Sequence, residues 1–165
     1  MCNQTLHEGT IMEYGSIKRE IYVEASPEVV FEVISSPVHI KEWWTAETDL
    51  EPIAGNTGEL VFGERGTPEA NVVQIAVIEV QPPRLFSFRW VHSPGEVATA
   101  TNSLLVTFEL IPAGASTVVR MTEVGFRETG WEVAVLEEAY REHSTGWDYF
   151  VPRIREYAQQ LVANR

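Results

Sequence analysis

The sequence holds a single cysteine and few basic residues. One cysteine, Cys2, cannot form an internal disulfide, a cysteine-based zinc site or an iron–sulfur cluster. Lys and Arg number 12 against 24 Asp and Glu, which gives a formal net charge of -12. Phosphate backbones and anionic lipid surfaces repel so acidic a chain. We therefore expect no nucleic-acid partner and no membrane partner.

Long apolar runs are missing as well, and so are several motifs of known chemistry. No stretch is apolar enough to cross a bilayer, and the first ten residues lack the basic and apolar regions of a signal peptide. The chain has no Gly-rich dinucleotide-binding motif, no Gly-x-Ser-x-Gly nucleophile turn and no metal-ligand cluster. We expect a soluble, cytoplasmic protein without a cofactor or a metal.

What is present suits one globular domain. Hydrophobic residues make up 44% of the 165 residues and charged residues 22%, which is typical of a folded chain. Residues 1–16 are polar and aperiodic, so we predict a flexible N-terminal tail. The single domain is expected over residues 17–165.

The pattern of the domain begins with a strand and two short helices. Apolar and polar residues alternate over residues 17–24, which predicts a half-buried strand. Ser26-Pro27 and Ser36-Pro37 each indicate a helix start, because serine caps a helix and proline suits its first position. Strand patterns separated by turn signals follow. The strands are predicted at residues 48–53, 59–63, 72–80, 86–90, 104–111 and 117–123.

The C-terminal part changes to a helical period. Thr129 and Glu132 fit a capping box, and apolar residues recur every three or four positions from Leu136 to Leu161. A run of strands with helices at both ends indicates an α+β fold, with an antiparallel sheet covered by the long helix. A twisted sheet cannot lie flush on a straight helix, so we expect a cavity between them.

Five segments, in this order, resemble the SRPBCC superfamily, which includes START domains and birch-pollen allergens. They are residues 25–31, 36–44, 86–90, 122–126 and 146–147. More narrowly, the chain is similar to the activator of Hsp90 ATPase homologue-like branch, over about residues 17–161. The resemblance implies a helix-grip fold: a curved antiparallel sheet of about seven strands around a long C-terminal helix. It also implies two short helices after the first strand and a hydrophobic pocket.

The walls of this pocket are expected to be aromatic. The candidate ligand-binding residues are Trp44, Phe62, Phe86, Phe88, Trp90, Phe108, Tyr140, His143 and Trp147. His143 has two interpretations. It is either a core or rim histidine satisfied by a neighbouring strand, or a polar tip that meets a ligand. As a general base it would need an orienting group, which the sequence does not place.

Two further groups of residues have structural interpretations. Trp43 and Trp44 are adjacent and cannot share one helix face, so we expect one to plug the core and the other to be partly exposed. Glu47, Asp49 and Glu51 alternate without a calcium-loop glycine pattern, which indicates a solvated strand face.

Three functions are compatible with these patterns. The first is binding of a small hydrophobic or aromatic ligand in the cavity between the sheet and the C-terminal helix. The second is a co-chaperone-like interaction domain, with a chaperone as partner. The third is a cyclase- or hydrolase-type enzyme on a lipophilic substrate, for which the sequence assigns no catalytic residue. The chain is expected to be a monomer or a homodimer.

Overall fold

The computed structural model describes residues 15–91 and 96–165 of the chain. The predicted tail, with Cys2, therefore lies outside the described residues except for its last two positions. Ser16 already belongs to the first strand.

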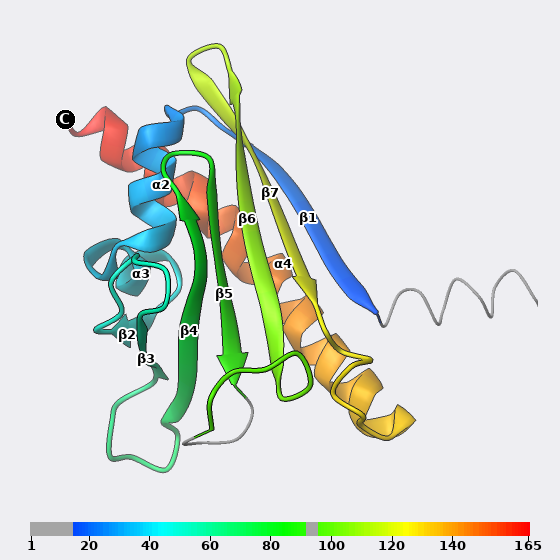
Figure 1. Ribbon diagram of the computed structural model, residues 1–165. Helices are drawn as coiled ribbons and strands as arrows, with labels where there is room; N and C mark the ends of the chain where they lie inside the picture. The colour runs from blue at the N-terminus through cyan, green and yellow to red at the C-terminus, as the bar shows by residue number, and fades with distance from the viewer. Residues whose placement is uncertain (1–14, 92–95) are drawn as a thin grey trace, which may run out of the picture.

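One seven-stranded antiparallel sheet forms the centre of the fold (Figure 1). Its spatial order is β1-β7-β6-β5-β4-β3-β2. The strands are β1 (Ser16–Val23), β2 (Ala46–Thr48), β3 (Thr57–Phe62), β4 (Asn71–Gln81), β5 (Leu85–Val91), β6 (Ser103–Ala113) and β7 (Ser116–Val124). Strands β2 to β7 follow each other as a meander, and β1 closes the sheet beside β7. The predicted α+β class and antiparallel sheet are confirmed.

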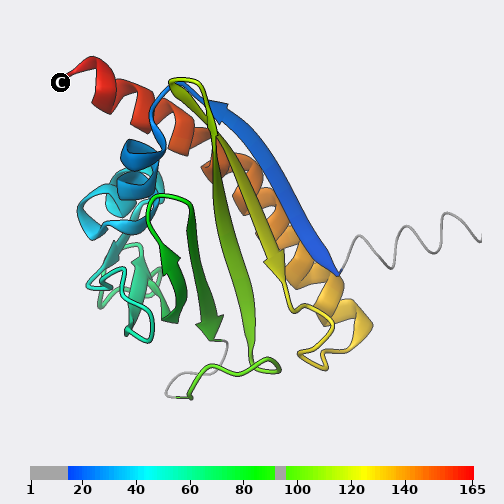
Figure 2. The same cartoon turned by 45° about the horizontal axis from the view of Figure 1, so that its top comes forward.

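Within residues 15–91 and 96–165, three helices accompany the sheet: α2 (Pro27–Ser35), α3 (Pro37–Trp43) and α4 (Val133–Ala163). The expected cap of α2 is present, because Oγ of Ser26 accepts a hydrogen bond from the backbone N–H of Val29 at 3.3 Å. Figure 2 shows α4 running along β1 and ending beside α2. Among the described residues, no helix is long and apolar enough to span a membrane.

The predicted capping box of α4 is wrong. The helix begins at Val133, and Glu132 in the N-cap position makes no side-chain capping bond. The hydroxyl of Thr129 donates instead to the carbonyl of Phe126 at 2.7 Å. Gly130 has a φ of +75°, which lies outside the helical region, so the helix cannot run through it from Thr129.

The second predicted strand, over residues 48–53, is also misplaced. Strand β2 ends at Thr48. Beyond it, Oγ1 of Thr48 accepts from the backbone N–H of Leu50 at 3.0 Å, and Oδ1 of Asn56 accepts from that of Glu51 at 3.2 Å. Side chains thus occupy the backbone donors that a strand would pair with its neighbour. The proposed strand face of alternating carboxylates is not formed.

Trp43 and Trp44 are both buried, with exposed fractions of 0% and 3%. The expectation that one of them is partly exposed is wrong. Their rings stack with centroids 5.2 Å apart and planes 3° from parallel. The chain leaves α3 for β2 at Trp44, so this second ring meets the sheet rather than solvent.

Candidate functional site

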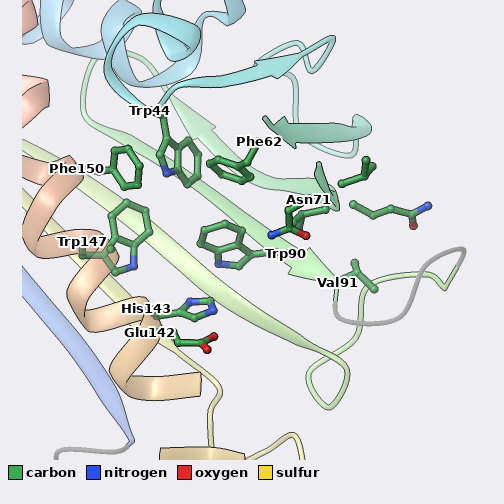
Figure 3. A pocket seen from close by; sticks show the side chains of 13 residues that line it. Trp44, Phe62, Asn71, Trp90, Val91, Glu142, His143, Trp147 and Phe150 are labelled. Atoms are coloured by element: carbon green, nitrogen blue, oxygen red, sulfur yellow. The ribbon is translucent and has the colours of Figure 1, made fainter. Parts of the chain in front are cut away.

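A pocket of about 350 Å³ lies between strands β3, β4 and β5 and helix α4 (Figure 3). Most of its wall is aromatic or aliphatic, and a few polar groups stand among these. The lining residues are Trp44, Phe62, Asn71, Val72, Val73, Gln74, Trp90, Val91, Glu142, His143, Gly146, Trp147 and Phe150. The volume falls in the lower part of the range for small-molecule sites, about 300–1,000 Å³.

The aromatic wall is an interlocked set of rings. The ring of Trp44 has its centroid 5.3 Å from that of Trp90, 5.5 Å from Trp147 and 5.8 Å from Phe62. These residues come from the end of α3, from β5, from α4 and from β3. Each such pair stabilises the fold by about 0.5–1.5 kcal/mol beyond its buried area. The wall is therefore held in place before any ligand enters.

A buried carboxylate lies behind this wall. Glu123 in β7 has an exposed fraction of 0%. Its side-chain oxygens accept hydrogen bonds from Nε1 of Trp90 at 2.7 Å and from Nε1 of Trp147 at 2.9 Å. Nδ1 of His143 is the third partner, at 2.9 Å from Oε2. Three N–H donors thus compensate the lost hydration of a group that is costly to bury.

His143 connects this carboxylate to the pocket. A carboxylate is an acceptor, so Nδ1 of the imidazole donates to it, and in the neutral ring Nε2 is then an acceptor. The side chain is 27% exposed and lines the pocket. Its ring packs edge-on against Trp90 at 5.3 Å and Phe126 at 5.7 Å. Glu123 on the neighbouring strand β7 thus satisfies one nitrogen of His143, and the ring also lines the pocket.

The other polar lining groups are at the rim. Glu142 and Asn71 are exposed, and Gln74 is half-buried. Among the described lining residues there is no Lys or Arg. No three His, Cys, Asp or Glu side chains within residues 15–91 and 96–165 lie close enough to hold a metal ion.

The structure distributes the nine sequence candidates over three places. Trp44, Phe62, Trp90, His143 and Trp147 line the pocket. Phe86, Phe88 and Phe108 lie buried in the core. Tyr140 is half-buried; its hydroxyl donates to the carbonyl of Ser16 at 2.9 Å and its ring packs on Phe126.

The sequence candidates did not include Glu123, nor eight of the lining residues, of which Phe150 is the aromatic one. A signal for Glu123 was present: buried positions alternate along β7, and Glu123 falls on the same face as Thr117, Val119 and Met121. Phe150 lies one helical turn from Trp147 on α4, so helical spacing also pointed to it.

Comparisons with known proteins agree on the fold. Residues 24–159 match the family model described as activator of Hsp90 ATPase homolog 1-like protein. A comparison with curated proteins found no match.

Three solved structures illustrate the likeness. Protein MLL2253 from Mesorhizobium loti is 24% identical, with a TM-score of 0.66 over 90% of this chain and 97% of that one. The Aha1 dimer from Colwellia psychrerythraea is 19% identical, with a TM-score of 0.66 over 87% and 96%. Protein NE0264 from Nitrosomonas europaea is 11% identical, with a TM-score of 0.69 over 89% and 96%. At these identities the structural likeness concerns the fold, and the family model adds the membership. The chain belongs to the family of activator of Hsp90 ATPase homolog 1-like proteins, within the SRPBCC superfamily.

Proposed function

We propose that the protein binds a small, flat, mainly aromatic molecule in the pocket between the sheet and α4. The observation that supports this most directly is the interlocked wall of Trp44, Phe62, Trp90 and Trp147 around a space of about 350 Å³. Such rings offer offset and edge-on contacts to another aromatic ring. The space suits a ligand of two or three fused rings.

Apolar burial supplies the affinity in this proposal. A two-ring ligand that loses about 200 Å² of apolar surface to the pocket gains about 5 kcal/mol, at about 25 cal/mol per Å². Part of this gain is spent on lost translational and rotational freedom. We therefore expect dissociation constants from micromolar to millimolar for simple two-ring probes, and tighter binding for a natural ligand that fills the space.

Gly146 provides a way to block the pocket without disturbing the core. It lines the pocket on α4, and a Cβ added there would meet no heavy atom within 4 Å. Gly146→Phe should therefore place a ring in the space that the ligand needs. Thr145→Phe is the matched control, because Thr145 is the exposed neighbour on the same helix.

The test is a titration with 2-methoxynaphthalene, followed through the indole N–H signals of Trp90 and Trp147 in two-dimensional NMR. Binding to the wild type and to Thr145→Phe, but not to Gly146→Phe, is the expected result. Equal binding to all three proteins would place the ligand elsewhere and overturn the proposal. Native mass spectrometry of freshly purified protein, compared with the denatured sample, would give the mass of a co-purified natural ligand.

The co-chaperone-like alternative draws its support from the family description. It needs a contact surface on the outside of the domain. An exposed apolar patch around Trp44 would support it, but that side chain is 3% exposed. A change in the ATPase rate of a chaperone on addition of this protein, retained by Gly146→Phe, would favour this alternative over ligand binding.

A further inference from the structure

Besides the amides of Asn71 and Gln74, the described polar side chains that line the pocket are acidic or titratable, and none is a permanent cation. The described lining residues include the exposed carboxylate of Glu142 and the imidazole of His143, and no cation. Behind the wall, the carboxylate of Glu123 adds a second negative charge. The whole chain has a formal net charge of -12. An anionic ligand is therefore disfavoured electrostatically relative to a neutral one, whereas a ligand with a hydrogen-bond donor finds acceptors in the lining.

His143 is the acceptor that such a donor would meet. The bond from Nδ1 to Glu123, at 2.9 Å, fixes both the ring orientation and the position of its proton. Nε2 lies on the other side of the ring, and none of the hydrogen bonds among the described residues uses it. Figure 3 shows the His143 ring between Trp90 and Glu142 at the edge of the pocket. An aromatic ligand held by the tryptophans would bring its ring substituent close to this nitrogen.

We infer that the pocket selects neutral aromatic molecules that carry a hydroxyl group, phenols or enols, through a hydrogen bond from that hydroxyl to Nε2 of His143. Glu123 is the positioning residue of this contact, because it determines which nitrogen accepts. Trp90 and Trp147 have a double role: their rings form the wall, and their N–H groups hold the same carboxylate. This inference rests on the proposed function and adds the chemical class of the ligand.

The test compares three probes that differ in one substituent: 2-naphthol, 2-methoxynaphthalene and 2-naphthoate. Titrations are run at about pH 8, where imidazole side chains are ordinarily neutral. 2-Naphthol should bind wild-type protein about three- to tenfold more tightly than 2-methoxynaphthalene, the effect of one neutral hydrogen bond. 2-Naphthoate should bind most weakly, because the carboxylates repel it.

The variant His143→Phe should remove this preference, because it keeps a ring against Trp90 and lacks the acceptor. His39→Phe is the matched control: His39 packs on Tyr157 and is not among the lining residues. Glu142→Leu removes a second acceptor at the rim, the exposed carboxylate, and the preference should survive it. A preference that survives His143→Phe, or disappears in Glu142→Leu, would overturn the inference.

A second measurement uses the wild type and does not depend on the folding of a variant. Long-range ¹H–¹⁵N NMR spectra of histidine rings show which nitrogen carries the proton. We expect the Nδ1–H form for His143, and a shift of its Nε2 signal with 2-naphthol but not with 2-methoxynaphthalene. An Nε2–H form or a doubly protonated ring would overturn the inference, as would tighter binding of 2-naphthoate.

The two proposals can fail separately. Equal affinities for 2-naphthol and 2-methoxynaphthalene, both lost in Gly146→Phe, would leave the proposed function standing and overturn the hydroxyl preference. Binding of neither compound to folded wild-type protein, up to the solubility limit, would overturn both.

Discussion

The indole N–H of Trp147 on α4 donates to the carboxylate of Glu123 on β7 at 2.9 Å, and both residues are buried. This bond joins the long helix to the sheet directly behind the pocket. The carboxylate also holds Trp90 from β5 and His143 from α4. One acidic side chain of β7 thus holds groups from another strand and from the long helix, so the shape of the pocket and the stability of the domain depend on the same contacts.

The first prediction concerns Glu123→Gln. An amide in this position still accepts through its oxygen, but its NH₂ group faces N–H donors, so at least one buried donor is left without a partner. Such a loss costs about 1–3 kcal/mol of the free energy of unfolding. Urea denaturation followed by circular dichroism measures this. Glu20→Gln is the control, because Glu20 is exposed and pairs with exposed Arg120, and it should change little. Equal stability of both variants and the wild type would contradict the role given to Glu123.

The second prediction concerns Trp43, which satisfies a carbonyl near the end of α2. Helix-terminal carbonyls lack intrahelical partners, and Pro37, four residues after Val33, has no N–H to donate. Nε1 of Trp43 donates to the carbonyl of Val33 at 2.7 Å instead. Trp43→Phe removes this donor and part of a fully buried ring, and should cost about 2–4 kcal/mol. Thermal and urea unfolding would show it. Tyr22→Phe, on an exposed tyrosine, is the comparison that should unfold like the wild type.

The third prediction concerns Gly146, where a substitution should stabilise the protein instead of destabilising it. Glycine inside a helix is less favourable than alanine by about 0.5–1 kcal/mol, and a Cβ at this position meets open space. Gly146→Ala should therefore raise the free energy of unfolding by that amount while making the pocket slightly narrower. Gly125→Ala should do the reverse, because its φ is +111° and a Cβ would lie 3.1 Å from the carbonyl oxygen of Ser103. If Gly146→Ala destabilised the protein, the space beside it would not be open.

The main features of the fold were predictable because they depend on periodicity and helix-start residues. Alternation located most of the strands, and Ser26-Pro27 located the start of α2. The errors arose where one side chain had several possible partners. Thr129 could cap a helix or close a turn. It closes a turn, because the positive φ of Gly130 is incompatible with a helix that starts at Thr129. The burial of Trp44 depended on the position of β3 and β5, which no local pattern gives.

Periodicity also made part of the candidate site predictable, because its aromatic residues lie on strand and helix faces that the sequence pattern identifies. The link between Glu123 and His143 joins positions 20 residues apart on different elements, and only the packing of α4 on the sheet brings them together. The alternation of β7 already assigned a glutamate to the inner face. An acidic residue at a core position should therefore be treated as a sign of buried donors around it.

The fourth prediction concerns Tyr157 on α4, whose hydroxyl lies 2.7 Å from Nδ1 of His39 on α3. Burial, with a smaller contribution from the charge of Glu42, raises the pKa of Tyr157 above its ordinary value of 10.0. A group whose pKa is raised by folding contributes its full stabilisation at pH values below its pKa in the unfolded chain. This contribution is lost as the pH rises through its pKa in the folded protein. The stability difference between wild type and Tyr157→Phe should therefore stay constant from about pH 8 to pH 9 and shift against the wild type above about pH 10. Urea denaturation at several pH values measures this difference. Tyr22→Phe, at an exposed tyrosine, should show no such shift. A constant difference between wild type and Tyr157→Phe across this range would mean that the hydroxyl titrates alike in the folded and unfolded chain, and that α3 and α4 do not bury it.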